Sequence, residues 1–191
     1  MVDVVLKCRC GAVQGMARDV SARSVTRAVC YCDDCQAFAC YLGRETTILD
    51  EYGGTEVFQM TPAQIDIRRG TQQLRCVRLT AGGMYRWYTA CCHTPVANTV
   101  SARLPFVAVI HAFMDATGVP DNHLGPVRFR VQGRHARGTP PYRTVYKGFP
   151  ARMLLRVLPR LLLAILRRQH RPTPFFDATG RPVVTPHVLA A

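Results

Sequence analysis

The stretch Cys30-Tyr31-Cys32-Asp33-Asp34-Cys35 places three thiols within six residues of a 191-residue chain, and Cys30, Cys32 and Cys35 are called the triplet below. Two more cysteines stand upstream in Cys8-Arg9-Cys10-Gly11. Such spacings suit one tetrahedral zinc ion, whose Zn–S bonds of about 2.3 Å need side chains that converge from a tight turn. They suit disulfide bonds poorly, because close cysteines leave little room for relaxed bridge geometry. We therefore predict a protein built around bound metal.

The cysteine content and the start of the chain both indicate a reducing compartment. Residues 1–7 lack the basic start and long apolar run of a secretory signal. Nine cysteines in such a chain are better explained by metal binding or chemistry than by disulfide bonds. We expect a cytoplasmic protein, with membrane association as an alternative.

Positive charge is concentrated late in the chain. The formal net charge is +13, and the segment from Arg128 to Arg171 holds twelve Arg or Lys residues and no Asp or Glu. The other thirteen basic residues face twelve acidic ones, so the rest of the chain is nearly neutral. We divide the chain into a zinc-binding β domain over residues 1–133 and an Arg-rich extension over residues 134–191.

The first domain is predicted to be mainly β, with antiparallel strands, because short β-branched and aromatic runs alternate with turn residues. The clearest signal is Thr80-Ala81-Gly82-Gly83, which joins two such runs as a hairpin. A short helix through Cys35 is expected, with Asp33 or Asp34 as its cap. The expected strands span residues 2–6, 24–30, 55–60, 74–79, 84–88, 106–113 and 127–131.

The triplet leaves the fourth coordination position of a zinc ion undecided. A structural zinc site is closed by four protein ligands, whereas a catalytic site keeps one position for water or substrate. No fourth cysteine stands at ligand spacing, because Cys40 is five residues beyond Cys35. Asp33 or Asp34 could close the site, and the alternative is three thiolates with an exchangeable position.

Cys8 and Cys10 need partners from far along the chain, and a second turn after a hairpin is the usual source in zinc-ribbon-like sites. The stretch 91–95, Cys-Cys-His-Thr-Pro, follows the predicted hairpin. Adjacent cysteines point apart in an extended strand, so both reach one ion only if the chain turns there. We expect Cys92 to be joined by one further ligand, drawn from Cys91, Cys76 and His93.

Cys76 is predicted to lie on the first strand of the hairpin, across from Trp87 or Tyr88. That position would let it approach the metal. The plainer interpretation of Cys76 and Cys40, which we favour, is a small buried apolar side chain.

Three motifs in this order resemble the glutathione-dependent formaldehyde-activating (Gfa, CENP-V-like) family. They are Cys-x-Cys-Gly-Ala-Val at 8–13, Cys-x-Cys-x-x-Cys at 30–35, and a hairpin ending in Cys-x-Thr-Pro at 92–95, so the resemblance covers about residues 6–98. It implies an Mss4-like fold, in which coiled antiparallel sheets surround one or two zinc ions. It also implies a structural zinc at Cys8, Cys10 and Cys92 and a catalytic zinc at Cys30, Cys32 and Cys35.

The chain departs from the family pattern at the late cysteine pair. Where the family has Cys-x-x-Cys-Gly, this chain has Thr89-Ala90-Cys91-Cys92-His93. Threonine is a poor zinc ligand, so either Cys91 substitutes for the residue at Thr89 or the structural site has lost a ligand. The chain is thus expected to be a divergent branch.

The resemblance implies an enzyme, a carbon–sulfur lyase that adds glutathione or another small thiol to formaldehyde or a small aldehyde. Zinc lowers the pKa of a bound thiol and polarises an aldehyde oxygen. Three thiolates weaken the ion as a Lewis acid, which favours thiol binding over aldehyde activation. Arg44 and Arg86 are the candidates for binding glutathione's carboxylates.

The extension contains a basic amphipathic helix, predicted over about residues 150–168. Its arginines are expected on one face, and its apolar run falls short of the ~20 residues that span a bilayer. We expect the wide apolar face to pack on the zinc domain or on a second subunit, with an anionic membrane surface as the alternative. Those arginines are Arg152, Arg156, Arg160 and Arg167.

Two further expectations concern the extension. No nucleic-acid-binding motif accompanies its charge, so nucleic acid is the least favoured partner. Residues 172–191, with Phe175 and Phe176, are expected to form an extended arm that either docks or is disordered. The alternative to an enzyme is a structural zinc module that presents this basic extension to a membrane, a nucleic acid or an acidic protein.

Overall fold

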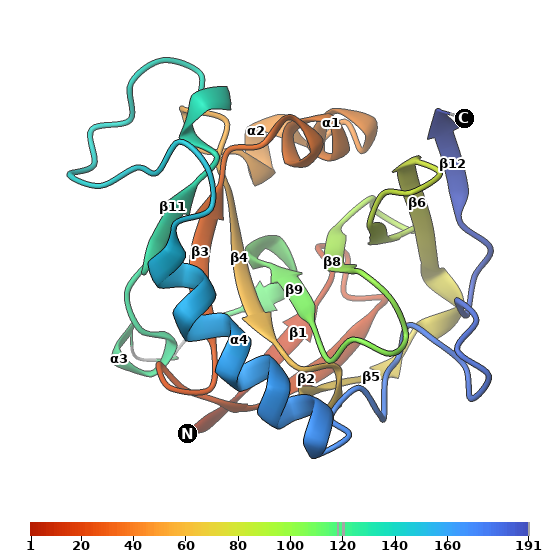
Figure 1. The fold of residues 1–191 in the computed structure, drawn as a ribbon. Coiled ribbons are helices and arrows are strands. Elements are labelled where there is room, and N and C mark those ends of the chain that lie inside the picture. The colour runs from red at the N-terminus through yellow and green to blue at the C-terminus, as the bar shows by residue number, and fades with distance from the viewer. Residues whose placement is uncertain (118, 120, 191) are drawn as a thin grey trace.

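The chain forms two β-sheets in the computed structural model, which describes residues 1–117, 119 and 121–190 (Figure 1). The smaller sheet has the order β10-β1-β2-β5 and the larger has the order β11-β3-β4-β9-β8-β7-β6-β12. The smaller sheet comprises β1 (Val2–Lys7), β2 (Gln14–Val20), β5 (Ile65–Arg69) and β10 (Met114–Asp115). The larger comprises β3 (Thr26–Cys30), β4 (Thr55–Met60), β6 (Leu74–Thr80), β7 (Tyr85–Thr89), β8 (Pro95–Thr99), β9 (Val107–Ile110), β11 (Phe129–Val131) and β12 (His187–Ala190).

The described residues form fewer helices than strands, and most of the helices are short. They are α1 (Asp33–Tyr41), α2 (Glu45–Ile48), α3 (Asp121–Leu124) and α4 (Ala151–Leu166), with 3₁₀ turns η1 (Pro62–Gln64), η2 (Thr71–Gln73), η3 (His111–Phe113) and η4 (Gly133–His135). Within the part of the chain that the structure describes, no helix is both long and apolar enough to cross a bilayer.

The prediction of a mainly β protein is confirmed, and the β6–β7 hairpin places Cys76 opposite Trp87 as expected. The expectation of antiparallel strands in residues 1–133 holds for most neighbours but is wrong for β11, which pairs with β3 in parallel at one edge of the larger sheet. At the other edge β12, in the C-terminal arm, pairs with β6 in parallel. Both strands are reached through long connections, which allow the chain to return in the same direction as its partner.

The C-terminal arm docks and completes the main core. Phe175 and Phe176 are buried against Trp87, with ring centroids 5.1 and 5.9 Å from the indole. The backbone amide of Val183 donates to the carbonyl of Phe175, and β12 then adds to the sheet edge beside β6 (Figure 1). Burial of two aromatic rings supplies the apolar contact that holds such an arm in place.

Helix α4 agrees with the predicted helix in extent but not in orientation. It lies beside β3 and β11 (Figure 1), and its inward residues Met153, Arg156 and Arg160 follow helical spacing. The wider part of its apolar surface points to solvent, so the expected packing of that face on the β domain is wrong, while packing on a second subunit stays a prediction. Of the four arginines expected on one face, Arg156 and Arg160 are half-buried, while Arg152 and Arg167 are exposed.

Candidate metal centres

Four cysteines from two distant turns meet in one cluster, called the quartet below. Cys8 and Cys10 lie in the turn after β1, and Cys91 and Cys92 lie in the turn after β7. Their sulfur atoms all lie within 4.8 Å of one another. The Sγ–Sγ distances are 3.5 Å for Cys8–Cys10, 3.4 Å for Cys10–Cys91, and 3.8 Å for both Cys8–Cys91 and Cys91–Cys92. A tetrahedral ion with bonds of about 2.3 Å holds its sulfurs roughly 3.8 Å apart, so the quartet has the dimensions of such a site.

Local backbone geometry explains why both adjacent cysteines reach the cluster. His93 has a φ of +53°, in the left-handed region, so the chain turns sharply directly after Cys92. On the other side of the cluster, Gly11 has a φ of +75°, and the amide of Val13 donates to the Cys8 sulfur at 3.2 Å. Amide donors of this kind stabilise a thiolate, as in metal-binding turns generally.

The structure selects Cys91 among the alternatives for the ligand that joins Cys92. Cys76 is buried in the core, where its sulfur contacts the carbonyl of Val77, and His93 is not part of the cluster among the described residues. Thr89 instead supports Cys92, because its hydroxyl lies 3.5 Å from the Cys92 sulfur and accepts the amide of Thr94. Thr89 is thus a neighbour of the cluster and not a member of it.

The electrostatics of the quartet favour ionisation of one thiol. Burial opposes ionisation of Cys92, but hydrogen bonds from Thr89 and Thr94 lower its pKa to about 5. Burial raises the pKa of Cys91 to about 12 and also raises that of Cys8. Full deprotonation of the quartet therefore needs a bound cation, which is the usual coupling between metal binding and thiol ionisation.

The triplet forms a second cluster, at the junction between β3 and α1. Cys30 ends β3, Cys32 is the N-cap of α1, and Cys35 lies in the first turn of the helix. The three sulfurs lie within 4.8 Å of one another, with 3.3 Å between Cys30 and Cys32. The expected N-cap at Asp33 or Asp34 is wrong by one or two residues, because both lie inside the first turn of α1. In that turn their carboxylates interact favourably with the positive end of the helix dipole.

Neither aspartate joins the triplet in the part of the chain that the structure describes. Asp33 pairs with His135 Nδ1 at 2.7 Å, and Asp34 pairs with Arg86 Nη2 at 2.9 Å. Both carboxylates are thus drawn away from the sulfurs by other partners. The candidate donor set is three thiols, without the carboxylate that the closed alternative requires.

Cys32 is the thiol of the triplet that ionises most readily. Hydrogen bonds from the thiols of Cys30 and Cys35 lower the pKa of Cys32. The contact with Cys32 raises the pKa of Cys30, and contacts with Cys30 and Cys32, together with burial, raise the pKa of Cys35. The N-terminal end of a helix adds to the stabilisation of a thiolate at this position.

The triplet opens on a cavity of about 330 Å³, whose lining is otherwise largely apolar. Arg86 also lines it, is only 2% exposed, and has an Nη1 atom without a hydrogen-bond partner in the described structure. Asn98 stands opposite Arg86 on β8 and lines the same cavity. The apolar lining includes Val57, Met84, Phe106, Ala108, Val131, Phe149 and Met153.

Of the two arginines expected to bind carboxylates, only Arg86 lies beside the triplet. Arg44 donates to the carbonyl of Cys92 at 2.8 Å and lines a separate cavity of about 270 Å³ next to the quartet. Arg44, which was suggested by its sequence neighbourhood alone, therefore lies at the quartet and not at the triplet.

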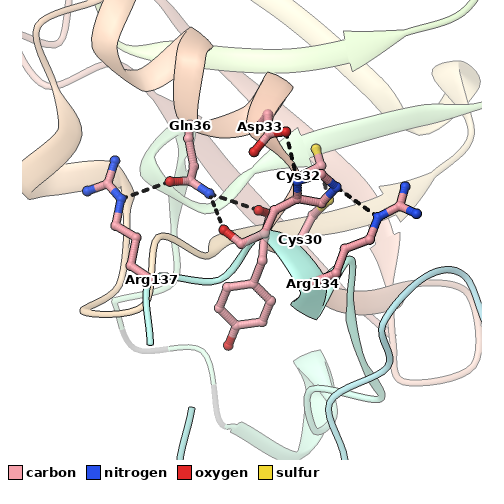
Figure 2. A network of polar contacts seen from close by, with 8 residues as sticks. Cys30, Cys32, Asp33, Gln36, Arg134 and Arg137 are labelled. Atoms are coloured by element: carbon pink, nitrogen blue, oxygen red, sulfur yellow. Dashed lines mark hydrogen bonds and ion pairs between the residues drawn. The ribbon is translucent and has the colours of Figure 1, made fainter. Parts of the chain in front are cut away.

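A polar network beside the triplet involves residues that sequence reasoning missed (Figure 2). Gln36 donates to the carbonyls of Tyr31 and His135, both at 2.9 Å, and accepts from Arg137 Nε at 2.8 Å. Figure 2 shows Gln36 and Asp33 facing the segment that carries Arg134 and Arg137. The only local signal was the run of basic residues, and pairing of β11 with β3 is what brings that run to the triplet.

Comparison with known proteins places the chain in a family without assigning it a function. No curated protein sequence matches the chain. A solved structure of a Rhodobacter sphaeroides protein, a structural genomics target, shares 16% identity with a TM-score of 0.45 and covers 66% of this chain and 97% of its own. A family model described as a family of unknown function, DUF6151, matches residues 1–186. Because that match spans nearly the whole sequence, the chain belongs to the DUF6151 family.

Proposed function

We propose that this protein is a zinc-dependent carbon–sulfur lyase of the Gfa type, with an Mss4-like fold. Its site joins a small thiol such as glutathione to formaldehyde or another small aldehyde, and also runs the reverse reaction. The observation that carries the proposal is the triplet, where three thiols converge at the wall of a cavity. Asp34 also lines this cavity, but its carboxylate pairs with Arg86 and is not part of the cluster. A three-ligand site beside a cavity is the arrangement of a catalytic zinc rather than a structural one.

The donor chemistry fits zinc in both clusters. Thiolates are soft ligands that select zinc over magnesium or calcium, and all nine cysteines are free thiols. The quartet offers four sulfurs and suits a closed structural site, whereas the triplet offers three. Zinc bound at the triplet would keep a substrate thiol ionised at neutral pH.

The reaction balances without any further reactant. The substrate sulfur forms a bond to the carbonyl carbon, the C=O π pair moves to the oxygen, and the proton lost by the thiol ends on that oxygen. The residues of the chain position the two reactants and exclude water. The apolar lining of the cavity excludes water. Holding both reactants side by side reduces the entropic barrier to their reaction.

The cavity also constrains the substrate. A volume of about 330 Å³ is at the small end of the range for ligand sites, so it suits the thiol end of a substrate and a small aldehyde. Arg86 is the one basic side chain among the lining residues, and its partner Asp34 is largely exposed at the edge of the site. We therefore expect Arg86 to pair with a single carboxylate or with the developing oxyanion.

The test combines metal analysis with thiol binding. Zinc per chain is measured by elemental analysis for the wild type, Cys32→Ser and the control Cys40→Ser, and each is titrated with glutathione by calorimetry. Cys40 is an exposed cysteine outside both clusters. The proposal predicts about two zinc ions in the wild type and in Cys40→Ser, and about one in Cys32→Ser, with glutathione binding lost only in the last.

Two outcomes contradict the proposal. Zinc content unchanged by Cys32→Ser would remove the triplet as a metal site. Zinc that is lost in Cys32→Ser, with no thiol binding by the wild type, would leave a structural zinc module in place of an enzyme.

A further inference from the structure

Helix α4 is amphipathic, but it is docked with its apolar face outward. Its inward positions recur at helical spacing and include Arg156 and Arg160 together with the buried Ala164. Most of the outward positions are leucine, and one is isoleucine. Leu155, Leu162 and Leu166 are 74, 61 and 81% exposed. The other exposed members of this face are Leu154, Leu158, Leu163 and Ile165.

Polar contacts hold the helix in this orientation. Arg156 Nη2 donates to the carbonyl of Ala22 at 3.2 Å, and Arg160 Nη1 donates to the hydroxyl of Thr26 at 3.0 Å. A second Arg160 nitrogen donates to the carbonyl of Arg23. A surface helix usually buries its apolar side and shows its charges to water. The reversed orientation leaves a contiguous apolar surface exposed, and such a surface on a folded protein marks a binding site.

Cations stand at both ends of this apolar face. Lys147 and Arg152 are exposed near the start of the helix, and Arg167 and Arg168 are exposed at its end. The whole segment from Arg128 to Arg171 contains no acidic residue. The surface therefore combines exposed leucines with positive charge and offers no negative charge of its own.

This combination decides between two occupants of the face. A second copy of the chain would bring its own cations against these, with no acidic residue in the segment to pair with them. An anionic bilayer supplies hydrocarbon for the leucines and phosphate headgroups for the flanking arginines and lysine. We propose that the outward face of α4 lies in the surface of anionic membranes, with the helix axis parallel to the bilayer plane.

The inference stands apart from the proposed chemistry, although the two surfaces are neighbours. Met153 of α4 and Phe149 just before it line the cavity at the triplet. Membrane contact would thus be made by the outer side of the same segment that closes the cavity wall.

Vesicle sedimentation of the full-length, zinc-loaded protein tests the inference. We expect binding to vesicles of 30% phosphatidylglycerol in phosphatidylcholine, weak binding to pure phosphatidylcholine, and a decrease with added salt. Leu155→Gln/Leu162→Gln/Leu166→Gln should weaken binding at least tenfold. The matched control changes three other exposed apolar residues, Val5→Gln/Val183→Gln/Leu189→Gln, and should bind like the wild type.

A charge variant keeps the test decisive if the leucine variant does not fold. Arg152→Gln/Arg167→Gln/Arg168→Gln alters only exposed side chains and should remove the preference for anionic vesicles. Wild-type protein that ignores anionic vesicles overturns the inference, as does equal binding by the leucine variant and the control. A wild type that dimerises in light scattering through the same leucines, without binding vesicles, would identify a self-association surface instead.

Discussion

Cys32 occupies a different electrostatic environment from the other cysteines of the triplet. It accepts hydrogen bonds from Cys30 and Cys35 and precedes the first turn of α1, and its pKa is lowered as a result. Cys40, at the other end of the same helix, is the more exposed residue of the two. Partial desolvation of its sulfur and contact with Glu45 nevertheless raise its pKa. The more accessible thiol of the two is thus the harder one to ionise.

This contrast predicts the order of alkylation in metal-free protein. Only thiolates react, and at about pH 6 Cys32 is ionised in preference to Cys40, so a short iodoacetamide pulse should label Cys32 first. The preference should narrow as pH rises, because Cys40 then begins to ionise. Peptide mapping by mass spectrometry under anaerobic conditions with a chelator measures both sites. Faster labelling of Cys40 at the lower pH would contradict the assignment of charge within the triplet.

Sequence spacing was enough to find the triplet and the pair Cys8 and Cys10, because ligand spacing is a local property. It could not choose between Cys91, Cys76 and His93, since that choice depends on the positive φ of His93 and on where the hairpin ends. Nor could it find Gln36, whose partners His135 and Arg137 are about a hundred residues away.

At the scale of elements, the C-terminal arm contributes directly to the main core. Phe175 is fully buried and packs against Trp87, the one tryptophan of the chain. Removing a buried phenylalanine side chain costs about 3–5 kcal/mol, from lost transfer free energy and the cavity left behind. The arm is therefore expected to unfold together with the domain.

Phe175→Ala should lower the free energy of unfolding by roughly that 3–5 kcal/mol. Urea titration followed by tryptophan fluorescence measures it, because Trp87 reports on the very contact that is removed. The control Leu189→Ala changes a partly exposed residue of the same arm and should have little effect. Equal, small losses in both variants would mean that the arm is held only by its edge pairing.

Elements with a strong local pattern were predicted closely, including the strand at 55–60 and the helix near 150–168. The parallel pairing of β11 with β3 and the pairing of the arm with β6 were not predicted, because β11 and β12 return through long connections whose path leaves no local signal. The periodicity of α4 predicted its two faces, but the expectation that the apolar face packs on the domain was wrong. That was decided by backbone carbonyls at Ala22 and Arg23, which accept from its arginines.

At the scale of the whole molecule, the quartet is a link between the two sheets. Cys8 and Cys10 follow β1 of the smaller sheet, while Cys91 and Cys92 follow β7 of the larger one. Cys8 and Cys91 are 83 residues apart in sequence. An ion held there binds only the folded chain, because unfolding separates the two halves of the site.

Removing the quartet should therefore cost more stability than removing the triplet. With free zinc about 100-fold above the dissociation constant, binding to the folded state alone is worth about 2.7 kcal/mol. For a chain of this size that corresponds to a shift of roughly 5–11 °C in the unfolding midpoint. Cys10→Ser should show this loss, and Cys10 is chosen because it is exposed, so the substitution leaves the core intact.

Cys32→Ser should lower the unfolding midpoint less, because the triplet spans only six residues and keeps part of its metal affinity in the unfolded chain. Binding to the unfolded chain offsets part of the stabilisation that the metal gives the folded state. Thermal unfolding of both variants and the wild type, in excess zinc and again in chelator, makes the comparison. The difference between Cys10→Ser and the wild type should disappear in chelator, where neither holds metal. A Cys10→Ser midpoint equal to that of the wild type in zinc would show that the two sheets are held together by packing alone.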